Sequence, residues 1–298
     1  MKHMDESQHT YLALLDAHGR LAVLESEQPE LIHDPVRVDE LTICPRPARG
    51  EEVSFRVRFD PNPEPCYAAV RAGVSAESLG LVVVGMGVVR VYRSREVGSA
   101  LHHGYGGGGG SGGANSRMEF YLAAEIEGHR GLVRDVAWAP GNIRGYDMIA
   151  TACQDGFVRV FRIDTPHDPN DGKSWAVADL MPRRQRPVAG TGTNTPSRDP
   201  EKHASGLSAS LARPGGSSSA SAGPSGHGSS GQVKHVVTEI SKLDAHRTPV
   251  WRVGFDDDGL IMGSVGDDGR LICYRQTPSG PWAKSSELAM IKTRMMMA

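Results

Sequence analysis

Histidine, a hydroxyl residue and aspartate recur twice in this chain, in the same order and at similar spacing. The first set is His129, Thr151 and Asp155, and the second set is His246, Ser264 and Asp268. These residue types form the triad of hydrolases, in which aspartate orients the histidine and the histidine takes the proton of the hydroxyl. The same types also form buried networks that only stabilise a fold. Repetition at matching positions favours the structural interpretation, and a hydrolase remains the alternative.

The aspartate of each set lies at a tight turn between two strands. Residues Val250 to Arg275 alternate apolar and polar side chains and are interrupted at two Asp-Gly turns. Asp-Gly supplies the positive φ angles of a hairpin, and the flanking β-branched and aromatic residues suit a pleated surface. This stretch therefore predicts an antiparallel meander of three strands.

The same layout occurs elsewhere in the chain. Val133 to Arg162 repeats it, with Asp155 six residues before Phe161 just as Asp268 is six residues before Tyr274. A third copy is predicted from three segments, Val53 to Pro61, Leu79 to Gly85 and Val88 to Arg93. Tyr11 to Glu25 forms a partial fourth copy, which indicates that the sequence begins inside a repeat. An isolated meander buries too little apolar surface to be stable, so the copies are expected to stack.

Further strand candidates lie between these units and supply an outermost strand to each. They are Glu119 to His129 and Val233 to His246, each ending at a histidine just before the next unit. We therefore divide the chain into a partial unit with an outer strand at 1–52 and complete units at 53–127, 128–246 and 247–298, the last with a tail. The aromatic residues expected in the cores of these units are Phe59, Tyr92, Trp138, Phe161, Trp251, Phe255 and Tyr274.

Four-stranded units with a preceding histidine and a turn aspartate six residues before an aromatic residue resemble the blades of WD-repeat β-propellers. The resemblance implies an all-β fold in which His, Ser or Thr, Asp and a terminal Trp form a network inside each blade. Phe161 and Tyr274 occupy the Trp positions here, so each network is expected to lack its indole donor.

The segments Gly128 to Ile163 and Val250 to Arg275 resemble, more narrowly, the carboxy-terminal blades of WD-repeat nucleoporins of the outer-ring Y complex of the nuclear pore. That family implies an open six-bladed propeller, of which this chain holds about three to four blades. It also implies a missing blade donated by an α-solenoid scaffold nucleoporin, a place at the nuclear envelope, and indirect support of mRNA and protein transport. The resemblance extends to a vacuolar-membrane complex that regulates TOR signalling. The alternative is the sister propeller of the COPII vesicle coat, which shares the opening "VWRV".

Charge, cysteine content and apolar runs argue against several classes of function. A net charge of −2 provides no electrostatic footprint for direct nucleic-acid binding. The four cysteines are widely separated in the sequence and are expected to be reduced thiols. Cysteines and histidines do not occur at the spacing of metal ligands, and no cofactor is expected. Asp256, Asp257 and Asp258 lack the alternating spacing of a calcium loop and read as a polar turn. The longest apolar run, Leu79 to Val89, is too short to span a membrane, so we expect a soluble intracellular protein.

Two segments interrupt the repeats. Residues 96–117 contain a glycine-rich loop, and residues from about 165 to 231 have too few apolar side chains to offset the entropy of ordering. Both are expected to be flexible or disordered insertions. Thr165 and Thr195 precede prolines and are expected to be accessible to kinases.

Overall fold

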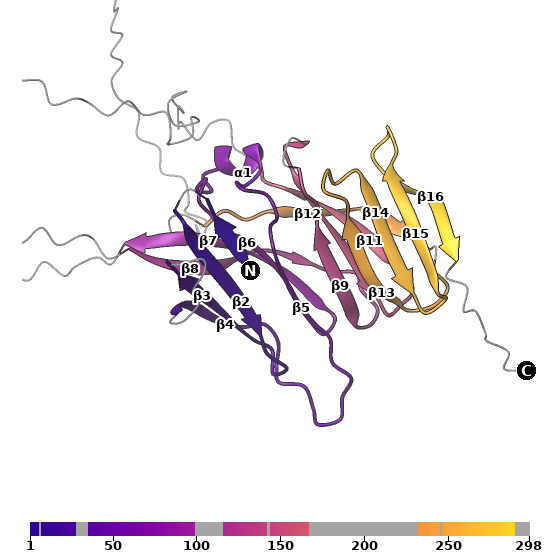
Figure 1. The fold of residues 1–298 in the computed structure, drawn as a ribbon, viewed down its shortest axis with the longest axis horizontal. Helices are drawn as coiled ribbons and strands as arrows, with labels where there is room; N and C mark the ends of the chain where they lie inside the picture. The colour runs from indigo at the N-terminus through magenta and orange to yellow at the C-terminus, as the bar shows by residue number, and fades with distance from the viewer. Residues whose placement is uncertain are drawn as a thin grey trace, which may run out of the picture. The chain divides into compact units, whose positions relative to one another are not determined.

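The computed structural model describes residues 1–5, 7–27, 35–98, 116–141, 144–166, 232–244 and 246–289. These residues form four antiparallel sheets, each of four strands (Figure 1). The prediction of an all-β fold is therefore confirmed. The glycine-rich loop between 99 and 115, and nearly all of the long insertion, including Thr195, lie outside the described residues.

Within each sheet the strands are paired in chain order. The first sheet contains β1 (Lys2–Met4), β2 (His9–Leu15), β3 (Arg20–Ser26) and β4 (Val36–Thr42). The second contains β5 (Phe55–Phe59), β6 (Gly80–Gly85), β7 (Val88–Gly98) and β8 (Ser116–Ile126). The third contains β9 (Val133–Trp138), β10 (Asp147–Cys153), β11 (Val158–Asp164) and β12 (Val236–Leu243). The fourth contains β13 (Val250–Phe255), β14 (Ile261–Gly266), β15 (Arg270–Gln276) and β16 (Trp282–Ala289).

The Asp-Gly turns lie where the sequence predicts them. Gly156 connects β10 to β11 with a φ of 86°, and Gly269 connects β14 to β15 with a φ of 68°. Side chains other than Asn or Asp rarely adopt this left-handed conformation, so glycine lets each hairpin close tightly. Met86 occupies the equivalent turn of the second sheet with a φ of 63°.

Some elements carry too weak a pattern to be found in the sequence. The strand β1 has only three residues, yet it completes the first sheet, which the sequence suggested was partial. The strand β16 lies in the segment predicted to be a tail. A helix of five residues, α1 (Tyr67–Arg71), interrupts the β5–β6 connection. Among the described residues, no helix is long and apolar enough to cross a membrane.

Successive sheets share apolar cores. The first and second sheets bury Leu21 of β3 and Leu81 of β6 in one cluster. The second and third sheets share another cluster, which contains Trp138. The third and fourth sheets share a cluster that contains Met148 and Tyr274. The four sheets therefore stack face to face in chain order, which is the packing of consecutive propeller blades.

The first strands of the sheets come together at the inner side of the stack. Residues of β1, β5, β9 and β13 line one cavity of about 640 Å³. Phe59, Trp138 and Phe255 are among the side chains that line it. Because each sheet presents its first strand to the same cavity, the sheets are arranged around a common inner side, as propeller blades are.

Most of the predicted core aromatic residues are buried. Tyr92, Trp138, Phe161 and Tyr274 are buried, whereas Phe59 and Phe255 are partly buried against the clusters. The prediction for Trp251 was wrong, because its side chain is 40% exposed. The pairing of β13 with β14 shifts between Val250 and Arg252, and this irregularity breaks the inward–outward alternation at Trp251.

Candidate functional site

The second His–Ser–Asp set forms a continuous network in the fourth sheet. His246 precedes β13, Ser264 lies on β14, and Asp268 lies in the β14–β15 turn. The Nδ1 atom of His246 is 3.0 Å from Oδ1 and 3.1 Å from Oδ2 of Asp268. Its Nε2 atom is 2.7 Å from Oγ of Ser264. These contacts match the order of groups in a hydrolytic triad.

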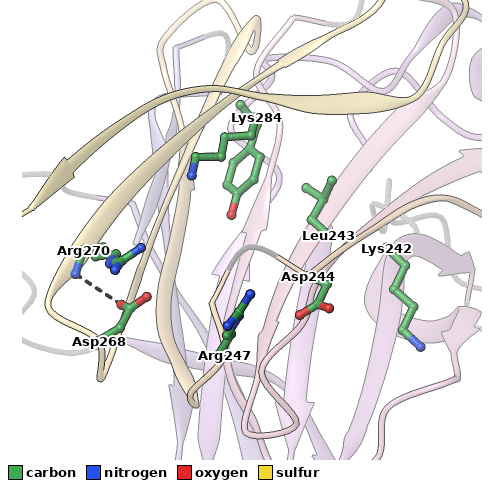
Figure 2. A pocket seen from close by; sticks show the side chains of 8 residues that line it. Lys242, Leu243, Asp244, Arg247, Asp268, Arg270 and Lys284 are labelled. Carbon is green, nitrogen blue, oxygen red and sulfur yellow. Dashed lines mark hydrogen bonds between the residues drawn. The ribbon is translucent and has the colours of Figure 1, made fainter.

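Burial separates this network from a working triad. His246 and Ser264 are each only 1% exposed, and Oγ of Ser264 is also 3.0 Å from the Tyr274 hydroxyl. A pocket of about 660 Å³ lies beside the network, and Figure 2 shows side chains that line it. Asp268 and Tyr274 line this pocket, whereas Ser264 and His246 do not. A substrate in the pocket would not meet the serine hydroxyl, so the arrangement stabilises the sheet and does not present a nucleophile.

Tyr274 forms the end of this network. Its hydroxyl lies 3.0 Å from Oγ of Ser264. Burial raises the pKa of Tyr274 to about 12, so the hydroxyl stays neutral. The network of the fourth sheet therefore ends in the tyrosine hydroxyl, at the position where the resemblance implies a tryptophan.

The first set is connected differently, in the third sheet. Nε2 of His129 is 2.9 Å from Oγ1 of Thr151, which lies on β10. Nδ1 of His129 is buried and has no hydrogen-bond partner among the described residues. Asp155 instead accepts from the guanidinium of Arg159 at 3.1 and 2.6 Å. The structure thus brings His129 to Thr151 but does not join His129 to Asp155.

Arg159 is a residue that our sequence reasoning missed. It lies on β11, four residues after Asp155, where the fourth sheet has the apolar Ile272 four residues after Asp268. Although burial opposes the effect, hydrogen bonds from Arg159 lower the pKa of Asp155 to about 2. Burial and the charge of Arg159 lower the pKa of His129 to about 4. The available signal was that Arg159 stands between Val158 and Val160, at the position where the fourth sheet has Ile272.

A second buried charge cluster joins the second and third sheets. Nη1 of Arg93 is 3.2 Å from Asp60, and its Nη2 is 2.6 Å from Asp147. Lys2 of β1 donates to the backbone oxygens of Asp60 and Asn62 at 2.8 and 2.6 Å. Side chains from three sheets therefore meet at the turn after β5. This cluster fixes the sheets relative to one another and was not predicted.

No metal centre is evident in the part of the chain that the structure describes. No group of three or more His, Cys, Asp or Glu residues there could hold a metal ion. The carboxylate of Asp256 accepts from the backbone N–H groups of Leu260 and Ile261 at 2.7 and 2.9 Å. This is the role of a turn-forming aspartate. Cys44, Cys66, Cys153 and Cys273 are all free thiols.

Thr165 corrects the expectation that it is accessible to kinases. Its side chain is buried, and Oγ1 lies 2.7 Å from Nδ1 of His235. Burial and the charge of Arg93 lower the pKa of His235 to about 3, so the ring remains neutral. The bond joins residues on either side of the long insertion, where the chain leaves and re-enters the described fold.

The outer faces of the first and fourth sheets are candidate interaction surfaces. On the first sheet, Leu12 and Leu24 pair across β2 and β3, on the face opposite the core residues Leu21 and Val23. Next to them Leu14 is 54% exposed. On the fourth sheet, Val265 and Leu271 pair on the face opposite Ser264 and Ile272. These side chains belong to none of the shared cores formed by the described residues.

Known proteins share sequence with the repeated four-stranded units of this chain. The WD domain, G-beta repeat family matches residues 120–162 and 237–275, which contain the strands around both His–Ser/Thr–Asp sets. These two segments of the chain therefore match WD repeats. The WD-repeat chain is 43% identical to nucleoporin SEH1 of Chaetomium thermophilum over 99% of its own length and 62% of that protein. It is 29% identical to nucleoporin SEH1 of Saccharomyces cerevisiae over 54% of its length and 39% of that protein.

A third relative extends the comparison. The WD-repeat chain is 24% identical to nucleoporin seh1 of Schizosaccharomyces pombe over 87% of its length and 54% of that protein. The chain therefore spans less than two thirds of the length of each relative. The predicted resemblance to WD-repeat nucleoporins is confirmed.

Proposed function

We propose that this WD-repeat chain is a non-catalytic scaffold segment of a nuclear pore subunit in the outer-ring Y complex, and that it supports mRNA and protein transport indirectly. The observation that carries the proposal is the 43% identity to a nucleoporin SEH1 across nearly the whole chain. The buried serine of the fourth sheet adds support, because a scaffold needs no accessible nucleophile.

The outer sheet faces indicate how the segment would assemble. Val265 and Leu271 form an apolar strip that a further sheet could cover, as Tyr274 and its neighbours cover the third sheet. A blade donated by an α-solenoid scaffold nucleoporin would bury this strip and pair with the exposed strand edges. Burial of apolar area contributes about 25 cal/mol per Å², so a blade-sized contact is a substantial driving force.

The proposed partners can be distinguished by location. A tagged chain expressed in Saccharomyces cerevisiae is expected at the nuclear rim, and affinity capture is expected to recover outer-ring nucleoporins. Recovery of a vacuolar-membrane TOR-regulating complex as well would support a second membership. Accumulation at endoplasmic-reticulum exit sites would favour a COPII coat scaffold instead. Diffuse signal with recovery of none of these assemblies would overturn the proposal.

A propeller hydrolase is the alternative of a different class. It would require Ser264 or Thr151 to become accessible to a substrate. Under the scaffold proposal, a serine-reactive fluorophosphonate does not label Ser264 in the folded chain. Stoichiometric labelling that is abolished by Ser264→Ala would favour the hydrolase.

A further inference from the structure

Trp251 is exposed, yet its orientation is fixed. Its Nε1–H group donates to Oδ1 of Asp267 at 2.6 Å. The guanidinium carbon of Arg134 lies 4.5 Å from the ring centroid, so a cation covers one face of the indole. Side-chain entropy is therefore largely lost before any ligand arrives, which is the condition for a preorganised contact residue.

One of the two supports of Trp251, Arg134, comes from a neighbouring sheet. Arg134 lies on β9 and is itself buried, and its guanidinium is paired with Glu52, which precedes β5. The chain of contacts thus runs from Glu52, in the segment before β5, through Arg134 of the third sheet to Trp251 and Asp267 of the fourth. The indole is therefore held relative to the third sheet and not only to its own strand.

Positive charge gathers on the same inner strands. Arg56 and Arg58 of β5 both reach toward Oδ1 of Asp135 on β9, at 3.8 and 3.4 Å. Oδ2 of Asp135 also accepts from the backbone N–H of Val253 on β13 at 3.2 Å. One buried carboxylate is therefore shared by two guanidinium groups that stay partly exposed.

Arg252 adds to this charge. It follows Trp251 on β13, is exposed, and has no ion-pair partner among the described residues. We name the surface formed by Arg56, Arg58, Trp251 and Arg252 the arginine–tryptophan edge. The strands β5, β9 and β13 that carry or support it lie next to one another (Figure 1).

We propose that the arginine–tryptophan edge binds an acidic, extended peptide segment with one apolar side chain that packs on Trp251. Trp and Arg dominate the energetics of protein interfaces when they are held rigidly. The partly exposed guanidinium groups of Arg56, Arg58 and Arg252 complement the carboxylates of an acidic peptide. The indole of Trp251 lies on the same inner strands and offers a contact for the apolar side chain. The inference does not depend on the assignment as a nuclear pore subunit.

Single-stranded RNA is the competing ligand, because it also uses aromatic stacking and arginine. The edge offers one exposed indole and no second aromatic platform among its residues, and the chain carries a net charge of −2. The arginine–tryptophan edge therefore cannot stack several successive bases. It suits a peptide with one apolar side chain flanked by carboxylates.

Calorimetric titration of the full chain with a peptide of glutamates flanking a central leucine tests the proposal. We expect binding that weakens steeply with salt, because partly exposed charges are screened within about 10 Å at 0.1 M. Trp251→Ala is expected to weaken binding at least about tenfold, the effect of losing a contact residue worth more than 1.4 kcal/mol. Arg252→Glu is expected to weaken it similarly through charge reversal.

Controls separate the edge from general charge effects. Arg37→Glu, an exposed site on β4, removes the same cation elsewhere and is expected to leave affinity unchanged. A peptide with lysines in place of glutamates is expected not to bind. Absence of binding at about 1 mM glutamate peptide, equal affinity of Trp251→Ala and wild type, or tighter binding of a uridine oligonucleotide would each overturn the proposal.

Discussion

Arg93 of β7 and Asp147 of β10 form an ion pair of 2.6 Å between the second and third sheets, and each side chain is only 1% exposed. Arg93 also contacts Asp60 at 3.2 Å, so one guanidinium serves two carboxylates. Burial raises the pKa of Asp147, and the charge of Arg93 opposes that rise. Loss of the arginine would leave the two buried carboxylates without their shared ion-pair partner.

Arg93→Met is therefore expected to destabilise the chain by about 3–5 kcal/mol, the cost of breaking a buried ion pair by removing one partner. Urea unfolding followed by circular dichroism measures the change. Arg37→Ala is the matched control, because Arg37 pairs with Glu40 at an exposed position. That change is expected to cost less than about 1 kcal/mol. Equal costs for the two substitutions would show that the buried cluster does not hold the sheets together.

The repeated meanders could be predicted because their signals are local. Strand alternation and the Asp-Gly turns at Gly156 and Gly269 are visible within a few residues of sequence, and the turns form as expected. The strand β1 has only three residues, too few to establish a period, so it could not be predicted. The strand β16 alternates weakly, because most of its side chains are exposed.

The buried charges could not be assigned from sequence, because their partners are distant in the chain. Arg93 and Asp147 are 54 residues apart, and no spacing rule connects them. Arg159 redirects Asp155 away from His129, a competition that matching His–Thr–Asp spacing cannot reveal. The predicted burial of Trp251 was wrong for another reason. One shift of pairing between β13 and β14 disrupts the side-chain alternation there.

Substitutions in the His246–Ser264–Asp268 network of the fourth sheet are expected to cost different amounts of stability. His246→Ala removes the group that joins Asp268 to Ser264, and we expect a loss of about 1–3 kcal/mol because buried polar atoms lose their partner. Tyr274→Phe removes only the terminal hydroxyl and is expected to cost about 1 kcal/mol. Thermal and urea unfolding report both values. A larger loss for Tyr274→Phe than for His246→Ala would contradict the described connectivity.

Two histidines with lowered pKa values, the partly buried His129 and the buried His235, predict acid sensitivity. The pKa values of His129 and His235 are lowered to about 4 and about 3, whereas an unfolded histidine titrates near 6.5. Between these values the unfolded chain binds more protons than the folded chain, so stability falls as pH drops below about 6.5. Each histidine is expected to contribute a slope of up to about 1.4 kcal/mol per pH unit.

The measurement compares urea unfolding of wild type and His129→Gln between about pH 7.5 and pH 5. Glutamine does not titrate and can still hydrogen-bond Thr151, so the variant is expected to lose less stability on acidification than the wild type. Parallel pH profiles would show that His129 is not held neutral by its surroundings.

Truncation of the two tryptophans on the inner strands, Trp138 and Trp251, is expected to cost very different amounts of stability. Trp138 is buried between the second and third sheets, so Trp138→Ala is expected to cost about 3–5 kcal/mol through lost packing and a cavity. Trp251 is exposed and loses only its contacts with Asp267 and Arg134, so Trp251→Ala is expected to cost about 1 kcal/mol or less. Urea unfolding of both variants tests this difference. A cost above about 3 kcal/mol for Trp251→Ala would place Trp251 in the core, as its sequence pattern predicted, and would remove the surface on which the proposed peptide binds.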